Sequence, residues 1–435
     1  MKINFKNSSV EKIYIPEGFP HFTDGIPTNI IVHFGLWKKE LTVEIDPLLP
    51  LDTLCISDRS FGSFDTPSDI NFEVKFQDRN FYIGPVIGFV PVASDNRLTD
   101  DNLDLFKKYM KCYPQINGLV ILFAANGIDF DTKTVEGFYY SLNEDKWKKG
   151  KFPFPSVVYR KTGFGKKTFD GIVDLLGNNM FNTYFFNKWE LWNYVSPYDY
   201  LRDYLPETAR LTSIDILDEM INKYKSVYLK QINGYKAKGI IKAYKSELGY
   251  HFVYRLKGEK IIKEKKDVEE FINEINKEKN YLIQQSIDIK LFEERPFDFR
   301  VILQKGKLGS WDCPGIIGRF GKKGSISTNF LLDGFSRNCI DSLKLVFGFS
   351  EKEAFQKEQE IIRVCKNICD KLNETVGHYA DLGIDVMIDC NQKIWILEVN
   401  KLHDHKFPLY GLNDSQMYYK VLSNPIYYAK FLSGF

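Results

Sequence analysis

Two short apolar runs near the C-terminus, joined by a polar turn, constrain this chain more than any other feature. The first run covers residues 383–389 and the second covers residues 394–400, with residues 390–393 between them. Alternation of side chains and a short turn predict an antiparallel β-hairpin. With a four-residue turn, antiparallel pairing places Asp385 directly opposite Glu398.

One face of this predicted hairpin gathers oxygen atoms. Asp385 and Glu398 share the face, and Asn400 joins them because residues two apart on a strand point the same way. Carboxylate and amide oxygens suit Mg²⁺, which commonly bridges to phosphate. Two opposed carboxylates without a cation would repel. The sequence therefore predicts a Mg²⁺ site here, and the competing interpretation is a hairpin whose acids merely face water.

The length and net charge of the chain limit the classes of protein to which it can belong. A chain of 435 residues exceeds one typical core, so two or three domains are expected. The formal net charge of +2 gives no reason to expect nucleic acid or an anionic membrane as the main partner. The N-terminus carries no long apolar run, and no apolar stretch approaches membrane-spanning length, so a cytoplasmic protein is expected.

The seven cysteines and six histidines offer no recognisable metal or disulfide pattern. Cys365 and Cys369 lie one helical turn apart among apolar residues, so we expect them to be buried. His403 and His405 follow the hairpin closely, and we expect them to lie in a polar loop.

The pattern of strands and helices changes along the chain. Residues 1–80 alternate like short strands separated by Pro, Gly and Asp, which predicts a β-rich N-terminal domain. Residues 81–182 read strand, helix, strand, which is typical of a small α/β domain. Residues 183–435 mix both elements and end in a long helix at 351–379 followed by the hairpin. The predicted fold class is α+β.

A lysine and a glycine-containing loop suggest a site for phosphate. Lys230 ends an apolar strand and is followed by a loop at residues 231–239 that holds two glycines and two lysines. Such a loop can wrap phosphate oxygens with backbone N–H groups and ammonium charge. A tight basic hairpin without a ligand is the alternative. The ammonium group of Lys230 must either contact an anion or reach water, because the residue lies in an apolar strand.

A second group of charges lies on a later strand. Asp298 and Arg300 share one face of the strand at residues 297–304, and Arg319 lies at a strand end near two glycines. The acid could accept a ribose hydroxyl, and the guanidinium forks could hold phosphate or carboxylate. Charge pairing across a sheet is an equally good interpretation of these residues alone.

The order of these motifs resembles the ATP-grasp fold, in which two α+β lobes clamp ATP. The resemblance covers about residues 185–425 and points to the endospore coat-associated YheC/YheD family. The segments that carry it are residues 188–191, 204–208, 228–230, 233–234, 383–385 and 398–400. Residues 84–88 and 155–159 resemble the domain that precedes ATP-grasp in that family. The strand at 298–301 also resembles the one in ligases that add glutamate to a ribosomal protein.

The resemblance implies a cofactor set of ATP with one or two Mg²⁺ ions, for which Mn²⁺ could substitute. Asp385, Glu398 and Asn400 would bind the metal, and Arg300 and Arg319 would neutralise the γ-phosphate or anchor the acceptor carboxylate. The residues implied to contact the nucleotide are Lys188, Lys230, Asn233, Gly234, Lys236, Lys238, Gly239, Gln284, Gln285, Ile287 and Asp298.

These nucleotide contacts divide by position. The two lysines at 188 and 230 would meet the phosphates, and the loop at 233–239 would close over them. Gln284, Gln285 and Ile287 would form the hinge that reads adenine, and Asp298 would hold the ribose. Relatives usually carry more glycine in the phosphate loop than this chain does.

The implied activity is that of an ATP-dependent carboxylate–amine ligase that forms an amide or peptide bond through an acylphosphate. The partners would be ATP, a carboxylate and an amine on an amino acid, peptide or protein tail. Two alternatives stay open: a spore-coat-associated structural protein with a non-catalytic ATP-grasp fold, and a small-molecule kinase. The sequence does not identify the substrates or decide whether the chain forms a homodimer.

Overall fold

The computed structural model describes residues 1–6, 8, 10–20, 25–61, 64–65, 67, 69–234, 239–254, 258–328 and 333–435. The chain forms two compact units. The first comprises Met1–Thr183, Gln304–Asp312 and Tyr419–Phe435, and the second comprises Tyr184–Leu303 and Cys313–Tyr418.

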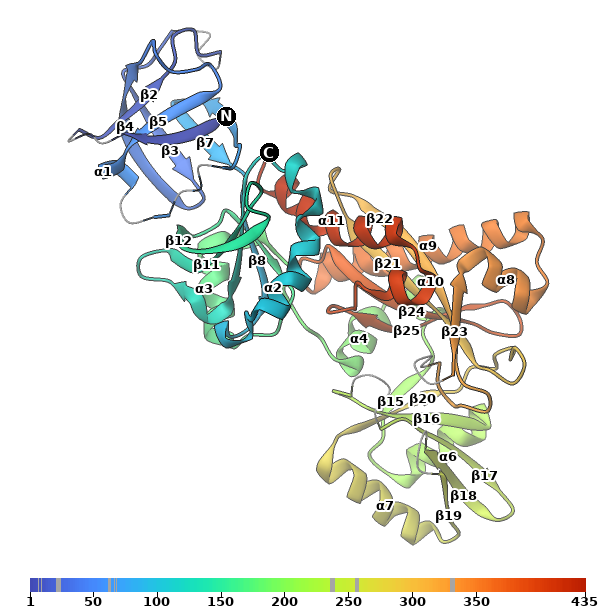
Figure 1. Ribbon diagram of the computed structural model, residues 1–435. Helices are drawn as coiled ribbons and strands as arrows, with labels where there is room; N and C mark the ends of the chain where they lie inside the picture. Colours follow the sequence, from blue (N-terminus) through green and yellow to red (C-terminus); the bar gives the residue numbers. More distant parts are fainter. Residues whose placement is uncertain are drawn as a thin grey trace. The chain divides into compact units, whose positions relative to one another are not determined.

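The first unit begins with a seven-stranded sheet in the order β1-β5-β2-β4-β3-β7-β6 (Figure 1). Its core follows the pleat: on β3 the alternate residues Ile30, Val32 and Phe34 are buried. The strands are β1 Lys2–Lys6, β2 Lys12–Ile15, β3 Asn29–Phe34, β4 Trp37–Ile45, β5 Thr53–Ser57, β6 Glu73–Gln77 and β7 Asn80–Gly84, and the short helix α1 is Asp58–Phe61. The β-rich character predicted for this part is confirmed.

A second sheet of the first unit has the order β10-β11-β9-β8-β13-β14, and β12 pairs with β11. Its centre is parallel, because β8 pairs in parallel with both β9 and β13. The strands are β8 Val86–Val92, β9 Leu119–Ala124, β10 Ile128–Asp129, β11 Thr134–Ser141, β12 Lys146–Pro153, β13 Val157–Arg160 and β14 Met180–Phe181.

The helices of this part connect or cover those strands. They are η1 Asp95–Arg97, α2 Asp100–Lys107, η2 Lys108–Gln115, η3 Ala125–Gly127, α3 Lys166–Leu176 and η4 Gly177–Asn179, and α11 Ser415–Leu432 closes the chain. The predicted strand–helix–strand arrangement is present between β8 and β9. The antiparallel hairpin of β11 and β12 was not predicted.

The second unit contains a six-stranded antiparallel sheet in the order β15-β20-β16-β17-β18-β19. Two amphipathic helices, α6 and α7, bury Leu217 and Ile272 against apolar strand residues such as Val227 and Phe252; Figure 1 shows both helices beside this sheet. The elements are α4 Lys188–Val195, α5 Asp199–Arg202, β15 Thr208–Arg210, α6 Ile214–Tyr224, β16 Ser226–Gln231, β17 Ile241–Ser246, β18 Gly249–Tyr254, β19 Gly258–Ile262, α7 Lys265–Glu278 and β20 Tyr281–Gln285.

A five-stranded sheet in the order β23-β22-β21-β24-β25 completes the second unit. Its elements are β21 Phe297–Lys305, β22 Trp311–Phe320, β23 Phe335–Asn338, α8 Cys339–Phe347, α9 Glu351–Thr375, β24 Asp381–Ile388, β25 Ile394–Asn400 and α10 Phe407–Leu412. The α+β class predicted from the sequence is confirmed, whereas the three predicted domain boundaries stay predictions.

The long helix α9 shows why the sequence located it well. Ser350 and Glu353 form a reciprocal capping box at its start, and Cys365 and Cys369 are buried as predicted. The helix ends at Thr375 rather than near residue 379, because the Asn373 side chain accepts a hydrogen bond from the Tyr379 N–H at 2.6 Å and turns the chain.

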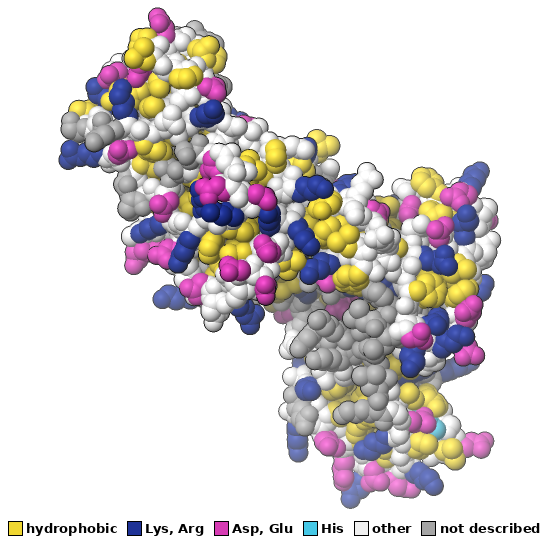
Figure 2. Space-filling model, in the orientation of Figure 1, with side chains coloured by type: hydrophobic (Ala, Val, Ile, Leu, Met, Phe, Trp, Pro, Cys, Tyr) yellow, Lys and Arg dark blue, Asp and Glu magenta, His cyan; other side chains and the backbone are white. Residues whose placement is uncertain are grey.

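The surface agrees with the nearly balanced composition. On the face shown in Figure 2, basic and acidic side chains are interspersed, as expected for a net charge of +2. Among the described residues, no helix combines the length and apolarity that crossing a membrane requires.

Candidate functional site

The hairpin of β24 and β25 brings together the three predicted oxygen donors. Asp385 and Glu398 are directly opposed in the register. Asn400 lies two residues beyond Glu398, and its side-chain Nδ2 is 3.5 Å from Asp385 Oδ2. The predicted face of oxygen donors is therefore formed.

The turn and the strand register of the hairpin differ from the prediction, although the pairing of Asp385 with Glu398 is the same. Ile388, not Asp389, pairs with Ile394, so the turn is one residue longer than predicted. A β-bulge next to Asp385 leaves Leu397 without a partner and shifts the register back by one residue. The bulge and the longer turn compensate, so the two acids remain opposed.

Two arginines converge on the Asp385 carboxylate. Arg300 Nε donates to Oδ1 at 2.6 Å and Nη2 to Oδ2 at 3.2 Å, while Arg319 Nη2 lies 3.1 Å from Oδ1. Arg319 also makes two hydrogen bonds of 2.6 Å to Asp298, which accepts a third from Thr328 at 2.5 Å. Neighbouring strands β21, β22 and β24 thus hold a buried network of guanidinium and carboxylate groups.

The network affects its two carboxyl groups differently: burial raises the pKa of Asp298 although the Arg319 guanidinium opposes it, whereas the charged form of Asp385 is favoured. Burial would raise the pKa of Asp385, but the guanidinium groups of Arg300 and Arg319 outweigh it and lower that pKa to about 2. Burial disfavours the charge of Arg319, yet Asp298 and Asp385 raise its pKa. An always-charged guanidinium pair therefore faces the hairpin.

Two lysines lie near the same patch: Lys188 at the start of α4 and Lys230 on β16 of the six-stranded sheet. Lys188 Nζ donates to the Gly234 carbonyl at 2.5 Å and lies 3.5 Å from Glu398 Oε1. Lys230 donates to the side-chain oxygen of Gln284. Burial lowers the pKa of Lys230 to about 8, and the charge of Lys188 adds to this effect while Glu398 opposes it.

Lys188 is held in place by the way α4 begins. Asn187 accepts hydrogen bonds from the N–H groups of Trp189 and Glu190 at 3.0 and 2.9 Å, and Glu190 accepts one from the Asn187 N–H at 2.7 Å. This capping box fixes Lys188 at the first position of the helix.

Comparison with known proteins places the chain in a family. The model of the YheC/D-like ATP-grasp family matches residues 177–432. The chain belongs to this family. Endospore coat-associated protein YheD of Bacillus subtilis is 26% identical over 364 residues, which cover 80% of this chain and 79% of YheD. Endospore coat-associated protein YheC of the same organism is 23% identical over 328 residues, 72% of this chain and 87% of YheC.

Solved structures that match this ATP-grasp protein share little sequence with it. D-alanyl-alanine synthetase A of Vibrio cholerae is 13% identical, with a TM-score of 0.44 over 80% of this chain and 97% of that one. A RiPP-associated ATP-grasp ligase of Chryseobacterium gregarium, solved with ADP and a leader and core peptide, is 12% identical, with a TM-score of 0.41 over 77% of this chain and 95% of that one.

The predicted hinge of this ATP-grasp domain lies at the end of β20. Gln284 is buried, and its Nε2 donates to Thr208 Oγ1 at 2.9 Å. Gln285 exchanges hydrogen bonds with the Glu207 backbone, at 2.8 Å through its own N–H and at 3.1 Å through its side-chain oxygen. Ile287 is half-buried just beyond the strand. Both glutamine side chains are thus occupied in fastening β20 to the segment around β15.

The predicted phosphate loop is described only at its ends. Asn233 is exposed, while Gly239 adopts a left-handed φ of 71°. This φ favours glycine, whereas the 2.1 Å approach of a Cβ at this position to the side-chain Nε2 of Gln231 could be relieved by movement of that flexible side chain. Lys236 and Lys238 fall outside the described residues.

The three residues predicted to bind metal, Asp385, Glu398 and Asn400, have the donor chemistry that a hard divalent cation prefers. All three donors are oxygens, if the Asn400 amide turns its oxygen inward, and Glu398 retains partial exposure. Arg300 and Arg319 engage Asp385 from one side, but each carboxylate oxygen can accept from a second direction.

Two residues near this patch were missed from the sequence. Lys401, directly after the second strand, donates to the Phe186 carbonyl, and burial lowers its pKa to about 8. Phe407 at the start of α10 lies 5.2 Å from the Arg300 guanidinium and 5.7 Å from that of Arg319. The sequence between Lys401 and Phe407 is typical of a polar loop. The only signal in the sequence was that Lys401 directly follows Asn400, a predicted site residue.

That loop differs from its expected character. His403 and His405 are buried, and each Nε2 lies 2.8–3.1 Å from oxygens of the buried Asp381 at the start of β24. A Cβ on Gly383 would lie 2.7 Å from His403 and 3.2 Å from the Arg300 side chain, so the loop backs the arginine directly. The expectation of a polar loop was therefore wrong about burial, because long-range packing and not local polarity decides it.

Proposed function

We propose that this chain is an ATP-dependent ligase that joins a carboxylate to an amine through an acylphosphate. The observation that supports it most is the buried pairing of Arg300 and Arg319 with Asp385, beside Glu398 and Lys188. This patch combines fixed cations for transferring phosphate with oxygen donors for a metal, which phosphoryl transfer requires.

The charge of the patch suits a metal–nucleotide complex. Its cationic side chains are Lys188, Lys230, Lys401, Arg300 and Arg319, and its anionic ones are Asp298, Asp385 and Glu398. The cations exceed the anions by two. A nucleoside triphosphate with one divalent cation carries about two negative charges at neutral pH, so the charges would balance.

The proposed reaction has two steps. A carboxylate oxygen attacks the γ-phosphorus of ATP, the bond to the β,γ-bridging oxygen breaks, and ADP leaves. The amine nitrogen then attacks the acyl carbon, the carbon–oxygen bond to phosphate breaks, and the amine loses a proton. Arg300 and Arg319 would neutralise charge on the transferring phosphoryl group or hold the carboxylate, which mainly lowers the barrier by positioning and electrostatics.

The remaining predicted roles follow the sequence assignment. Lys188 and Lys230 would contact phosphates, the segment from Asn233 to Gly239 would cover them, and Gln284 through Ile287 would border adenine. Asp298 would accept a hydrogen bond from the ribose with the same carboxylate that already accepts hydrogen bonds from Arg319 and Thr328. Asp385, Glu398 and Asn400 would hold Mg²⁺, which would supply positive charge to offset that of the phosphates.

Release of ADP and phosphate tests this proposal. We expect ADP release that requires both a carboxylate and an amine when pairs of amino acids and peptides are screened with ATP and Mg²⁺. Asp385→Ala combined with Glu398→Ala should abolish it by removing metal ligands, whereas Asp199→Ala, which changes an exposed acid on α5, should not. ADP release that survives the double change would reject the assignment.

A second candidate function has support from the relatives. YheD and YheC of Bacillus subtilis are both described as endospore coat-associated. The chain could therefore be a coat-associated protein that binds nucleotide without turnover. Tight ADP binding together with no ADP release under any substrate condition would favour this role over the ligase.

A further inference from the structure

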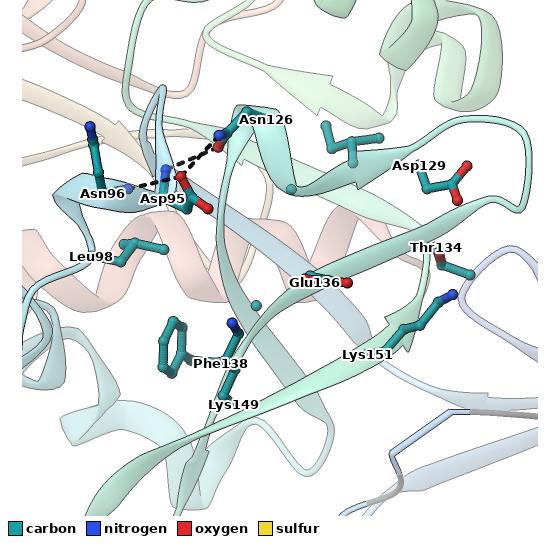
Figure 3. A pocket seen from close by; sticks show the side chains of 13 residues that line it. Asp95, Asn96, Leu98, Asn126, Asp129, Thr134, Glu136, Phe138, Lys149 and Lys151 are labelled. Carbon is teal, nitrogen blue, oxygen red and sulfur yellow. Dashed lines mark hydrogen bonds between the residues drawn. The ribbon is translucent and has the colours of Figure 1, made fainter.

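A polar hollow of about 610 Å³ lies in the first unit, well apart in the sequence from the residues discussed above. It opens at the carboxyl ends of the parallel strands β8 and β9 and is walled by the hairpin of β11 and β12 (Figure 3). Ligands of open α/β sheets characteristically bind outside the carboxyl ends of the strands. The volume falls in the range of small-molecule sites.

The two strand-end loops are locked to each other. Asn126 Nδ2 donates to Asp95 Oδ1, and the Asp95 N–H donates to Asn126 Oδ1, both at 3.0 Å. The Asn96 N–H adds a bond of 2.9 Å to the same carboxylate. The Asn126 side chain is the main reason that the pKa of Asp95 is lowered, so the acid stays ionised at neutral pH.

The hairpin wall packs closely onto the strand behind it. A Cβ on Gly137 would lie 2.7 Å from the Leu122 carbonyl oxygen, and one on Gly127 would lie 2.7 Å from the Glu136 carbonyl oxygen. Glycine at these two positions allows the backbones to approach. The floor of the hollow is therefore backbone held at short range, not mobile side chains.

The charged side chains of the wall make no close ion pair with another described residue, although the pKa of Asp129 is lowered by hydrogen bonds from Thr132 and, to a smaller extent, by the charge of Lys151. Glu136 and Lys151 are directly opposed across the hairpin, and Lys149 is opposed to Phe138. In the part of the chain that the structure describes, the side chains of Glu136, Lys149 and Lys151 make no ion pair or hydrogen bond. Figure 3 shows Glu136 and Lys149 along the wall, and Lys151 extending toward the side of the hollow where Thr134 and Asp129 lie.

The opposite face of the same strand provides a direct contrast. Residues two apart share a face, so Lys146 and Lys148 point away from Lys149 and Lys151. Both outward lysines form ion pairs with Glu144. One face of β12 therefore neutralises its lysines within the chain, and the face toward the hollow leaves them available.

We propose that this hollow binds a zwitterionic ligand, an α-amino acid or a short peptide with free ends. Lys149 and Lys151 would bind the carboxylate of this ligand, and Asp95 and Glu136 would bind its ammonium group. Leu98 and Phe138 add apolar surface for a side chain. The biological role of this site rests on the proposed function, because a ligase consumes compounds of this class.

Binding to the full-length protein tests the assignment. The probes are L-alanine, L-glutamate, L-lysine and L-alanyl-L-alanine, with N-acetyl-L-alanine amide as a probe blocked at both ends, measured by saturation-transfer NMR and calorimetry. We expect at least one free-ended probe to bind and the blocked one not to bind. Lys149→Gln with Lys151→Gln should weaken binding at least about tenfold, the effect of losing charged hydrogen bonds.

Lys146→Gln with Lys148→Gln is the matched control on the same strand and should leave binding unchanged. Absence of binding by every free-ended probe at millimolar concentration, or equal weakening by both double variants, would overturn the proposal. ADP binding measured on the same preparations separates the two ideas. ADP binding without probe binding rejects this site alone, and probe binding without ADP binding rejects the ligase.

Discussion

The charges around Asp385 are buried and paired, whereas Glu136 and Lys149 are exposed and, among the described residues, make no ion pair. Desolvation explains the difference: a guanidinium or carboxylate taken from water must find partners within the fold, while one at the surface keeps its water until a ligand arrives. The first group is built before any ligand binds and contributes to folding. The second should contribute almost nothing to folding, so variants at the two places should behave oppositely.

The largest expected effect is at Arg319. Arg319→Ala leaves the buried Asp298 carboxylate with the Thr328 hydroxyl but no cation, and removes one of the two guanidinium partners of Asp385, so the free energy of unfolding should fall by about 3–5 kcal/mol. Urea denaturation of the purified chain measures it. Arg319→Lys should rescue little, because an ammonium cannot make two parallel bonds to one carboxylate.

Arg202→Ala serves as the control, since Arg202 pairs with an almost fully exposed acid and its loss should cost about 0.5 kcal/mol or less. Equal decreases in the free energy of unfolding for Arg319→Ala and Arg202→Ala would contradict the distinction between buried and exposed charges.

A smaller effect on the free energy of unfolding should appear at acidic pH. The pKa of Asp385 is about 2 in the folded chain, below the ordinary 3.8, so its stabilising contribution is full above about pH 4 and is lost as the pH falls toward about 2. We expect roughly 2 kcal/mol of the acid-induced loss to come from this group. Asp385→Asn should lack that component, so its stability should fall less steeply over the same range. Parallel curves for the two proteins would contradict the assignment.

Phe407 should have a more modest role. Removing its ring in Phe407→Ala takes away a surface near both guanidinium groups, at 5.2 and 5.7 Å, and should cost about 1 kcal/mol through this contact. Phe407→Tyr keeps the ring and should retain it. A loss that is the same for both variants would show that the ring face is not what stabilises the arginines.

The smallest effect is expected in the hollow. Lys149→Gln should change the free energy of unfolding by less than about 0.5 kcal/mol, because no partner is lost. Lys148→Gln on the other face removes an ion pair with Glu144 and should lower the free energy of unfolding more than Lys149→Gln does. A larger loss at Lys149 than at Lys148 would mean that the hollow is maintained by its own charges.

Sequence reasoning succeeded where local pattern decides structure. Apolar alternation located the strands that carry Asp385 and Glu398, and the spacing of buried residues located α9. The pairing of Arg300 with Asp385 was less accessible, because it depends on which strands are neighbours in the sheet.

Tertiary context explains what sequence reasoning missed. Strand β12 holds four lysines and a glycine, so its composition gives little sign of a strand, and pairing with β11 overrides that weak propensity. His403 and His405 look like loop residues for the same reason: only the approach of Asp381, more than twenty positions away, accounts for their burial.

The extra residue in β25 has a consequence for how such hairpins can vary. A one-residue change in a tight turn would ordinarily rotate every following side chain to the opposite surface. Here Leu397 absorbs that change before it reaches Glu398. The length of the connection and the alignment of the acids are therefore uncoupled, and homologous proteins could lengthen or shorten the connection while a compensating insertion preserves the pair.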